Sequence, residues 1–230
     1  MAINNYYFKA RLFPTVLTSI PAIIIYNKFV ANIYHDKLEN IYAGLPTITD
    51  LIFSGAIIFL LVQINRFFSK EIFQRLYFKD EINMPTTNLL LKSNSELENS
   101  IKHKIEDKIK SKFDINLLTS TEETTDNLRA RKLIATTVSQ IRNLLRDNTL
   151  LLQHNIEYGF FRNFIGGSFI AFIISLIIVL SSLYTTDIPT RNLGLILTCI
   201  YSLPILFSKL IMNRYGIYYA KILYEQFLTV

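Results

Sequence analysis

The feature that most constrains this chain is an uncharged apolar run from Phe164 to Tyr184. A helix needs about 20 such residues to cross the hydrocarbon core of a bilayer. Few helices of soluble proteins are apolar around their whole circumference. The run therefore predicts a transmembrane helix, and the rest of the sequence is interpreted with a membrane in mind.

Three further apolar stretches predict additional spans. Pro14 and Pro21 interrupt the first stretch, whereas Lys209 extends the last one because its charged end can reach the membrane surface. Counted with the run described above, we expect four spans, at about 12–33, 47–68, 164–184 and 192–210.

These spans predict an all-α membrane protein with four transmembrane helices. A mainly helical cytoplasmic domain is inserted between helices 2 and 3. We expect a first transmembrane hairpin at 1–68, the cytoplasmic domain at 69–163, and a second hairpin with a cytoplasmic tail at 164–230. Apolar residues make up 50% of the chain and occur in blocks, which favours this division over one soluble core.

Basic residues near the ends of the spans predict the orientation. Lys and Arg are enriched in the cytoplasmic segments that flank membrane helices. We therefore expect both termini and the central region to face the cytoplasm. The basic residues on that side are Lys9, Arg11, Arg66, Lys70, Arg75, Arg162, Lys209, Arg214 and Lys221.

The central region contains the patterns of two amphipathic helices. Ser95 with Glu98, and Ser120 with Glu123, have the spacing of capping boxes, which begin helices. Apolar residues recur every three or four positions after each, which gives one buried face per helix. These residues are Leu97, Ile101, Ile105, Ile109 and Phe113 in the first, and Ile134, Val138, Ile141 and Leu145 in the second.

Three arginines share one arc of the second helix and form a candidate binding site. Arg131, Arg142 and Arg146 fall beside its apolar face. The guanidinium group suits phosphate, so an anionic signal or a lipid headgroup is one possible ligand. The alternative is a set of salt bridges to acidic residues such as Glu122, Glu123 and Asp126, or to a neighbouring subunit.

A second candidate site precedes the third span. His154, Glu157 and Tyr158 lie on neighbouring turns, in a position to bond to the turn at Asp80–Thr87. The alternative is a belt of aromatic and basic side chains in 153–163 that anchors the span at the headgroups.

No motif predicts catalysis or metal binding. The chain lacks a phosphate-binding loop, and its single cysteine, Cys199, cannot form a disulfide within the chain or a cysteine-based zinc site. We therefore expect a protein that is not an enzyme and has no catalytic residue, metal ion or cofactor. Nucleic-acid binding is not expected from the net charge of +6 alone, because it requires basic residues clustered on one face, whereas basic residues at membrane edges and on solvated helices also give this charge.

Two segments beside the expected membrane edges carry a resemblance: Asp80-Glu-Ile-Asn-Met-Pro-Thr-Thr87 and Gln153–Asn163. With the four-span layout, they resemble small multi-span membrane proteins of bacterial antiphage defence systems. The resemblance implies a membrane effector that perturbs the envelope on infection, as an oligomer with a cytoplasmic partner. It assigns no role to an individual residue.

The leading hypothesis is therefore an oligomeric inner-membrane effector or sensor in antiphage defence, which permeabilises the membrane on a cytoplasmic signal. Its expected partners are the lipid bilayer, further copies of the chain, and a cytoplasmic protein or an anionic signal. Three alternatives stay open. They are a membrane anchor or scaffold that recruits a soluble effector, a membrane enzyme that uses His154 and Glu157, and a small channel or transporter.

Overall fold

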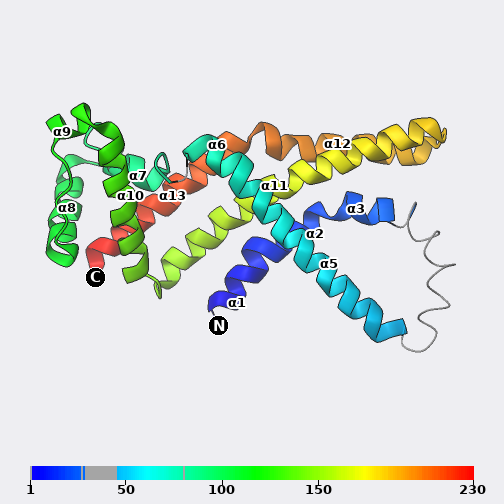
Figure 1. Ribbon diagram of the computed structural model, residues 1–230, viewed down its shortest axis with the longest axis horizontal. Helices are drawn as coiled ribbons and strands as arrows, with labels where there is room; N and C mark the ends of the chain where they lie inside the picture. Colours follow the sequence, from blue (N-terminus) through cyan, green and yellow to red (C-terminus); the bar gives the residue numbers. More distant parts are fainter. Residues whose placement is uncertain (1, 27, 29–45, 80) are drawn as a thin grey trace. The chain divides into compact units, whose positions relative to one another are not determined.

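The computed structural model describes residues 2–26, 28, 46–79 and 81–230, and every regular element in this part of the chain is a helix (Figure 1). The all-α prediction is confirmed. The chain divides into two compact units: unit 1 is Met1–Phe73 with Gly159–Ser208, and unit 2 is Gln74–Tyr158 with Lys209–Val230. The end of the expected first span, the loop after it and Asp80 lie outside the described residues.

Unit 1 is built from the amino-terminal helices and from a helical hairpin. A break at Ser19 separates two short helices, and Pro21 occupies the first turn of the second, where it requires no amide donor. The described elements are α1 (Ala2–Tyr7), the π-helix η1 (Phe8–Leu12), α2 (Phe13–Thr18), α3 (Ile20–Ile25), α5 (Pro46–Phe68), most of the π-helix η3 (Ser69–Gln74), most of α11 (Thr149–Tyr184), and α12 (Ile188–Leu206).

Helices α11 and α12 lie side by side as the expected hairpin (Figure 1). Gly194 allows the close approach, since a Cβ atom there would lie 2.9 Å from a methyl group of Val179. The connection is short: Asp187 accepts a hydrogen bond from the Thr190 amide at 3.1 Å and so caps α12. The second helix therefore begins at Ile188, about four residues earlier than expected.

Helix α11 is long and apolar enough to cross a membrane by itself. Helices α12 and α13 (Ser208–Thr229) pass the same test together if they are counted as one span with a break at Phe207. Among the described residues this gives one candidate span, or two. The four-span arrangement remains a prediction from the sequence.

A layer of buried polar side chains joins the helices of unit 1, and we call it the polar layer: Thr15, Thr18, Asn65, Ser69 and Asn163. Asn65 Nδ2 donates to the hydroxyl groups of Thr18 at 3.0 Å and Thr15 at 3.2 Å. Ser69 Oγ donates to Asn163 Oδ1 at 3.1 Å. Because buried polar groups are costly unless they are hydrogen-bonded, these pairs fix the register of α2, α5, η3 and α11.

Two consecutive glycines bring α11 against this layer. A Cβ atom on Gly166 would lie 2.6 Å from Ser69 Cβ and 2.7 Å from the Asn65 carbonyl oxygen. One on Gly167 would lie 2.6 Å from Asn65 Nδ2. Small residues at such positions allow helix backbones to approach closely.

Unit 2 is a bundle of short helices whose boundaries differ slightly from the predicted ones. Ser95 does not cap a helix, because the helix begins after Glu98. The second capping box is formed by Thr119 and Glu122, one residue earlier than predicted. The elements are α6 (Arg75–Phe78), α7 (Pro85–Leu90), α8 (Asn99–Phe113), α9 (Ser120–Thr125), α10 (Asn127–Leu144), the first turns of α11, and α13.

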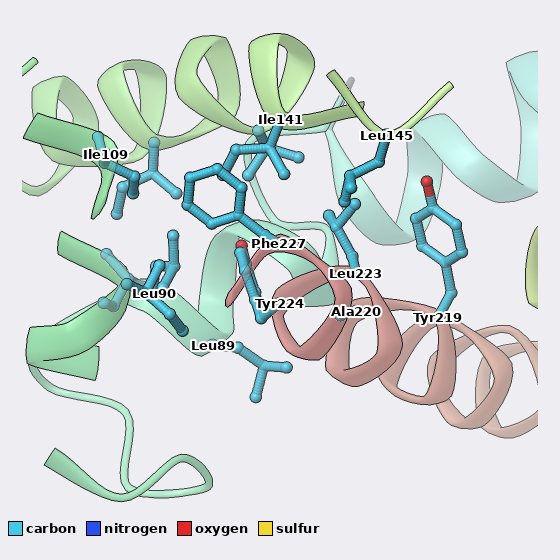
Figure 2. Packing of buried hydrophobic residues seen from close by; sticks show 14 of the residues in the cluster. Leu89, Leu90, Ile109, Ile141, Leu145, Tyr219, Ala220, Leu223, Tyr224 and Phe227 are labelled. Atoms are coloured by element: carbon cyan, nitrogen blue, oxygen red, sulfur yellow. The ribbon is translucent and has the colours of Figure 1, made fainter. Parts of the chain in front are cut away.

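The core of unit 2 is completed by α13, the carboxy-terminal helix (Figure 2). Its buried residues recur at helical spacing: Tyr219, Ala220, Leu223, Tyr224 and Phe227. They pack against the apolar faces that the sequence predicted for α8 and α10. The domain therefore extends beyond the predicted 69–163, and the segment expected to be a cytoplasmic tail forms part of its core.

Two aromatic side chains of α13 make specific contacts in this core. The Phe227 ring stacks on that of Phe113, with 6.0 Å between centroids and 6° between planes. The Tyr224 hydroxyl donates to the Thr86 carbonyl oxygen, and burial raises the pKa of Tyr224. Tyr224 therefore stays a neutral donor and ties α13 to α7.

Replacement of Leu223 by alanine tests the place of α13 in the core. Leu223 is fully buried, so Leu223→Ala is expected to lower the free energy of unfolding of unit 2 by about 2–5 kcal/mol. Hydrogen exchange in peptides of α8 and α10, measured by mass spectrometry on the full chain in detergent, should rise accordingly. Lys221→Ala, at an exposed site on the same helix, is the matched control. Equal protection in both variants would exclude α13 from the core.

Gly166→Ala tests the close packing of unit 1. Because the new methyl group meets Ser69 and the Asn65 backbone, we expect a loss of about 1–3 kcal/mol in stability, seen as a lower thermal midpoint in detergent. Gly55→Ala is the control, since nothing lies within 4 Å of its Cβ position. It should be neutral or slightly stabilising through helix propensity. Similar midpoints for the two variants would contradict the packing described.

Candidate functional site

A strained turn in unit 2, which we call the 81–88 turn, is the centre of the candidate site. Glu81 has a φ of 75°, a left-handed conformation that is unfavourable for a residue with a side chain. Thr87 Oγ1 donates to the Glu81 carbonyl oxygen at 2.8 Å, and Asn88 Nδ2 donates to that of Asn83 at 3.0 Å. These bonds hold a conformation that the backbone alone would not favour.

Two of the three predicted arginines lie on α10 and bind this turn, whereas Arg146 follows the end of this helix at Leu144. Arg131 Nη1 donates to Asn88 Oδ1 at 2.6 Å and to the Ile82 carbonyl oxygen at 3.2 Å. Arg142 Nη1 donates to Glu81 Oε1 at 3.1 Å. The third, Arg146, is exposed. The three arginines predicted to share one face therefore have different roles. Arg131 and Arg142 hold the 81–88 turn, whereas Arg146 lies on the surface.

Arg142 is a half-buried structural cation. Burial by itself lowers its pKa, but the surrounding groups, mainly Tyr219 and Glu81, raise the pKa above its usual value. The Arg142 guanidinium carbon also lies 5.9 Å from the centre of the Tyr219 ring. The salt-bridge alternative thus describes Arg142 correctly, but its partner is Glu81, not the acidic residues near the start of α10.

The residues predicted on α11 lie close to the same turn through one contact. The buried Tyr158 hydroxyl lies 3.8 Å from the Met84 sulfur, a weak hydrogen bond. His154 Nδ1 lies 3.4 Å from Glu157 Oε2 on the same helix. The expected link between Gln153–Asn163 and the turn therefore exists at Tyr158, whereas His154 and Glu157 contact each other.

An open pocket of about 420 Å³ lies beside the turn, and we call it the Arg131 pocket. Its walls come from α7, the loop after α7, α10 and α13. The volume is within the range of small-molecule sites in proteins. Its lining is more polar than usual for such sites and comprises Pro85, Asn88, Leu89, Leu91, Ser93, Asn94, Glu96, Arg131, Asn213 and Ile217.

One wall of this pocket, the 91–94 loop, is fixed by two buried charges. Lys102, which is 2% exposed, donates its ammonium group to the carbonyl oxygens of Leu91, at 2.7 Å, and Asn94. Glu123, which is 3% exposed, accepts from the Lys92 amide at 2.7 Å and from the Ser93 amide at 3.0 Å. Each of the four residues of the loop is thus hydrogen-bonded through its backbone to Lys102 or Glu123.

The two charges respond differently to burial. Burial lowers the pKa of Lys102. Burial opposes the charged form of Glu123 as well, but hydrogen bonds from Lys92 and Ser93 outweigh it, so the pKa of Glu123 is lower than usual. Glu123 therefore stays ionised at neutral pH and stabilises the loop there.

The arrangement suits recognition of a polar or anionic group. Arg131 presents a planar guanidinium beside the amides of Asn88, Asn94 and Asn213, which donate or accept hydrogen bonds. Within the described ranges no group of histidine, cysteine and acidic residues is suited to hold a metal ion.

Sequence reasoning missed the residues that build this pocket. Lys102 lies in a lysine-rich stretch that looks solvated, and only its position opposite the 91–94 loop shows that it is buried. Asn213 belongs to a segment that looked like a tail. The one usable signal was Pro85, which predicted a helix boundary, and α7 does begin there.

No protein-family model, curated protein or solved structure matches the chain.

The effect of pH on the 91–94 loop tests the role of Glu123. A carboxylate with a lowered folded-state pKa stabilises the fold above its unfolded value, near 4.5, and this contribution is lost as the pH falls toward the folded-state pKa. Glu123→Gln is expected to cost about 1–3 kcal/mol at pH 7, since the new amide group faces donors. The difference from wild type should shrink below pH 4.5.

The measurement is hydrogen exchange in peptides covering the 91–94 loop, between pH 3.5 and 7.5, corrected for intrinsic exchange rates. Glu98→Gln is the matched control, because Glu98 is exposed and its side chain makes no capping hydrogen bond. A difference between Glu123→Gln and wild type that stays constant across this range would show that Glu123 is not the titrating group.

Proposed function

We propose that this chain is an integral protein of the bacterial inner membrane, with unit 1 in the bilayer and unit 2 in the cytoplasm. The observation that carries the proposal is the apolar outer surface of α11 and α12. Leu180 is 65% exposed and Leu206 is 74% exposed, and many of their apolar neighbours also point outward. The core helix of a soluble protein buries such side chains, and a lipid-facing helix exposes them.

The composition of unit 2 supports its placement in water. It encloses most of its large apolar side chains in one core, and its surface carries the charged faces of α8 and α10. A folded polar domain of this kind does not enter the hydrocarbon region, because its charges would lose their hydration.

The connectivity of unit 2 supports a two-pass hairpin. Residues before Tyr158 and after Lys209 pack in the same core, so both must lie on the same side of the membrane. If α11 crosses the bilayer, the chain has to return before Lys209. Helix α12 is the segment available for this return, and the Lys and Arg distribution favours the cytoplasm as the shared side.

Within this placement, the chain acts as an effector or sensor. Unit 2 receives a cytoplasmic signal at the Arg131 pocket and the 81–88 turn. Unit 1 responds by rearranging its helices, as an oligomer, to perturb or permeabilise the membrane. Two features support a response by rearrangement: a strained turn beside the pocket, and outward apolar faces that can repack against other copies.

Expression in bacterial cells with a potential-sensitive dye tests the effector function. Because α11 belongs to both units, an insertion of three glycines after Tyr158 should uncouple them. We expect overexpressed wild-type chain to depolarise the membrane and the insertion variant to lose most of this effect while still sedimenting with membranes. The control is the same insertion after Thr185, in the turn between α11 and α12.

A scaffold is the second candidate function, and the polar Arg131 pocket favours it because such a surface also suits a peptide segment. In that case wild-type cells would stay polarised at every expression level. Arg131→Ala would then release a co-purifying partner, whereas Arg129→Ala, at an exposed site, would retain it. Polarised cells together with a constitutively bound partner would overturn the effector proposal.

A further inference from the structure

The guanidinium group of Arg131, on the wall of the Arg131 pocket, is held by neutral oxygen atoms. Its Nε donates to Asn127 Oδ1 at 2.6 Å, and its Nη1 donates to the side-chain oxygen of Asn88 and to the Ile82 carbonyl oxygen. The remaining nitrogen, Nη2, carries two further N–H donors. No acceptor for Nη2 is present among the residues that the structure describes. The group is therefore fixed through two nitrogens and retains the donors of the third.

The charge of Arg131 also differs from that of its neighbour on the same helix. Arg142 Nη1 donates to the Glu81 carboxylate at 3.1 Å, so its charge is balanced. Arg131 is half-buried as well, but in the described ranges it has no carboxylate partner. A partly desolvated charge gains more from an opposite charge than one in water does. The pocket therefore favours a ligand with an anionic group near Arg131.

Glu96 brings the opposite charge to the lining of the same pocket. Asn94 Oδ1 accepts from the Glu96 amide at 2.8 Å, and Lys102 binds the Asn94 carbonyl oxygen, so the backbone that carries Glu96 is fixed. Within the described part of the chain, the Glu96 carboxylate forms no ion pair with Arg131 or with another cation. A simple anion would be attracted by Arg131 and repelled by Glu96. A ligand that carries both charges would satisfy the two residues.

The remaining walls suit a small polar molecule. Gly216 brings α13 against α7, since a Cβ atom there would lie 2.8 Å from Pro85 Cγ, and this approach adds Asn213 to the lining. The side chains of Ser93 and Asn213 can each donate and accept hydrogen bonds. The volume of about 420 Å³ is in the range of sites for small organic molecules and is larger than a single inorganic ion requires.

We propose that the Arg131 pocket binds a small zwitterion, a molecule with one carboxylate and one ammonium group, such as a free amino acid or a dipeptide. The carboxylate accepts from Arg131 Nη2 in a charge-assisted hydrogen bond, and the ammonium group pairs with Glu96. The identification of this ligand as the cytoplasmic signal rests on the effector function proposed above, whereas its binding does not.

Thermal-shift assays and titration calorimetry on the full chain in detergent test the site. The common free amino acids and L-alanyl-L-alanine are tested one by one. The tightest of them is then compared with its N-acetyl form, which lacks the ammonium group, and with its amide, which lacks the carboxylate. We expect at least one zwitterion to bind, and each modified form to bind at least about tenfold more weakly, because each loses one charged hydrogen bond.

Variants assign the two charges. Glu96→Gln should remove the difference between the zwitterion and its N-acetyl form, and Glu98→Gln, at a neighbouring exposed site, should retain it. Arg131→Gln should remove the difference between the zwitterion and its amide, and Arg129→Gln is its matched control. Because Arg131 also holds the 81–88 turn, the exposed Glu96 gives the variant that separates binding from folding. Circular dichroism of Glu96→Gln should equal that of wild type.

Three results would overturn the proposal. They are no binding of any tested zwitterion to wild type, equal binding of the zwitterion and its N-acetyl form, and the same ligand preference in Glu96→Gln and Glu98→Gln. The potential-sensitive dye in cells keeps this test apart from that of the effector function. Binding with the expected preferences, in a chain that leaves cells polarised, would support the site and reject the effector function.

Discussion

The packing of α13 into the core of unit 2 is the constraint on which the rest of the structure depends. Phe227 stacks on Phe113 of α8, Leu223 lies in the same core, and Tyr224 donates to the backbone of α7 (Figure 2). The amino-terminal and carboxy-terminal parts of unit 2 therefore form one core, although the α11–α12 hairpin separates them in the sequence. This closure requires the chain to leave unit 2 at Tyr158 and to return at Lys209.

In unit 1, hydrogen bonds between buried polar side chains hold the helices together. Asn65 and Asn163 join α2, α5, η3 and α11 through side-chain hydrogen bonds, and Gly166 with Gly167 lets the helices approach closely enough to form them. In an apolar medium such bonds and close contacts replace the hydrophobic driving force between helices.

The sequence predicted those features that depend on local periodicity. The apolar faces of α8 and α10 and the hairpin turn near Asp187 are set within a few neighbouring residues, and all three are present. The predicted arc of arginines is present only in part, because α10 ends at Leu144 and Arg146 lies beyond it. The sequence further predicted a contact between the 81–88 turn and the start of α11, and Tyr158 makes it.

The features that the sequence did not predict depend on long-range packing. Glu81 pairs with Arg142 across 61 positions, and no local pattern indicates that pair. The burial of Lys102 and Glu123 arises because both contact the 91–94 loop, not because of their own neighbours. The role of α13 was missed because its core contacts are with α7, α8 and α10, which are far from it in the sequence. The two spans predicted at 12–33 and 47–68 still rest on hydropathy and charge asymmetry alone.

The most direct test of this account is the side of the membrane on which two positions lie. In a Cys199→Ser background, Thr185→Cys reports the hairpin tip and Ser111→Cys reports unit 2, both at exposed sites. Each is treated with a membrane-impermeant maleimide in intact spheroplasts. The account predicts that position 185 reacts directly and position 111 reacts only after permeabilisation. Reaction of both positions in intact spheroplasts, or recovery of the chain in the soluble fraction, would contradict it.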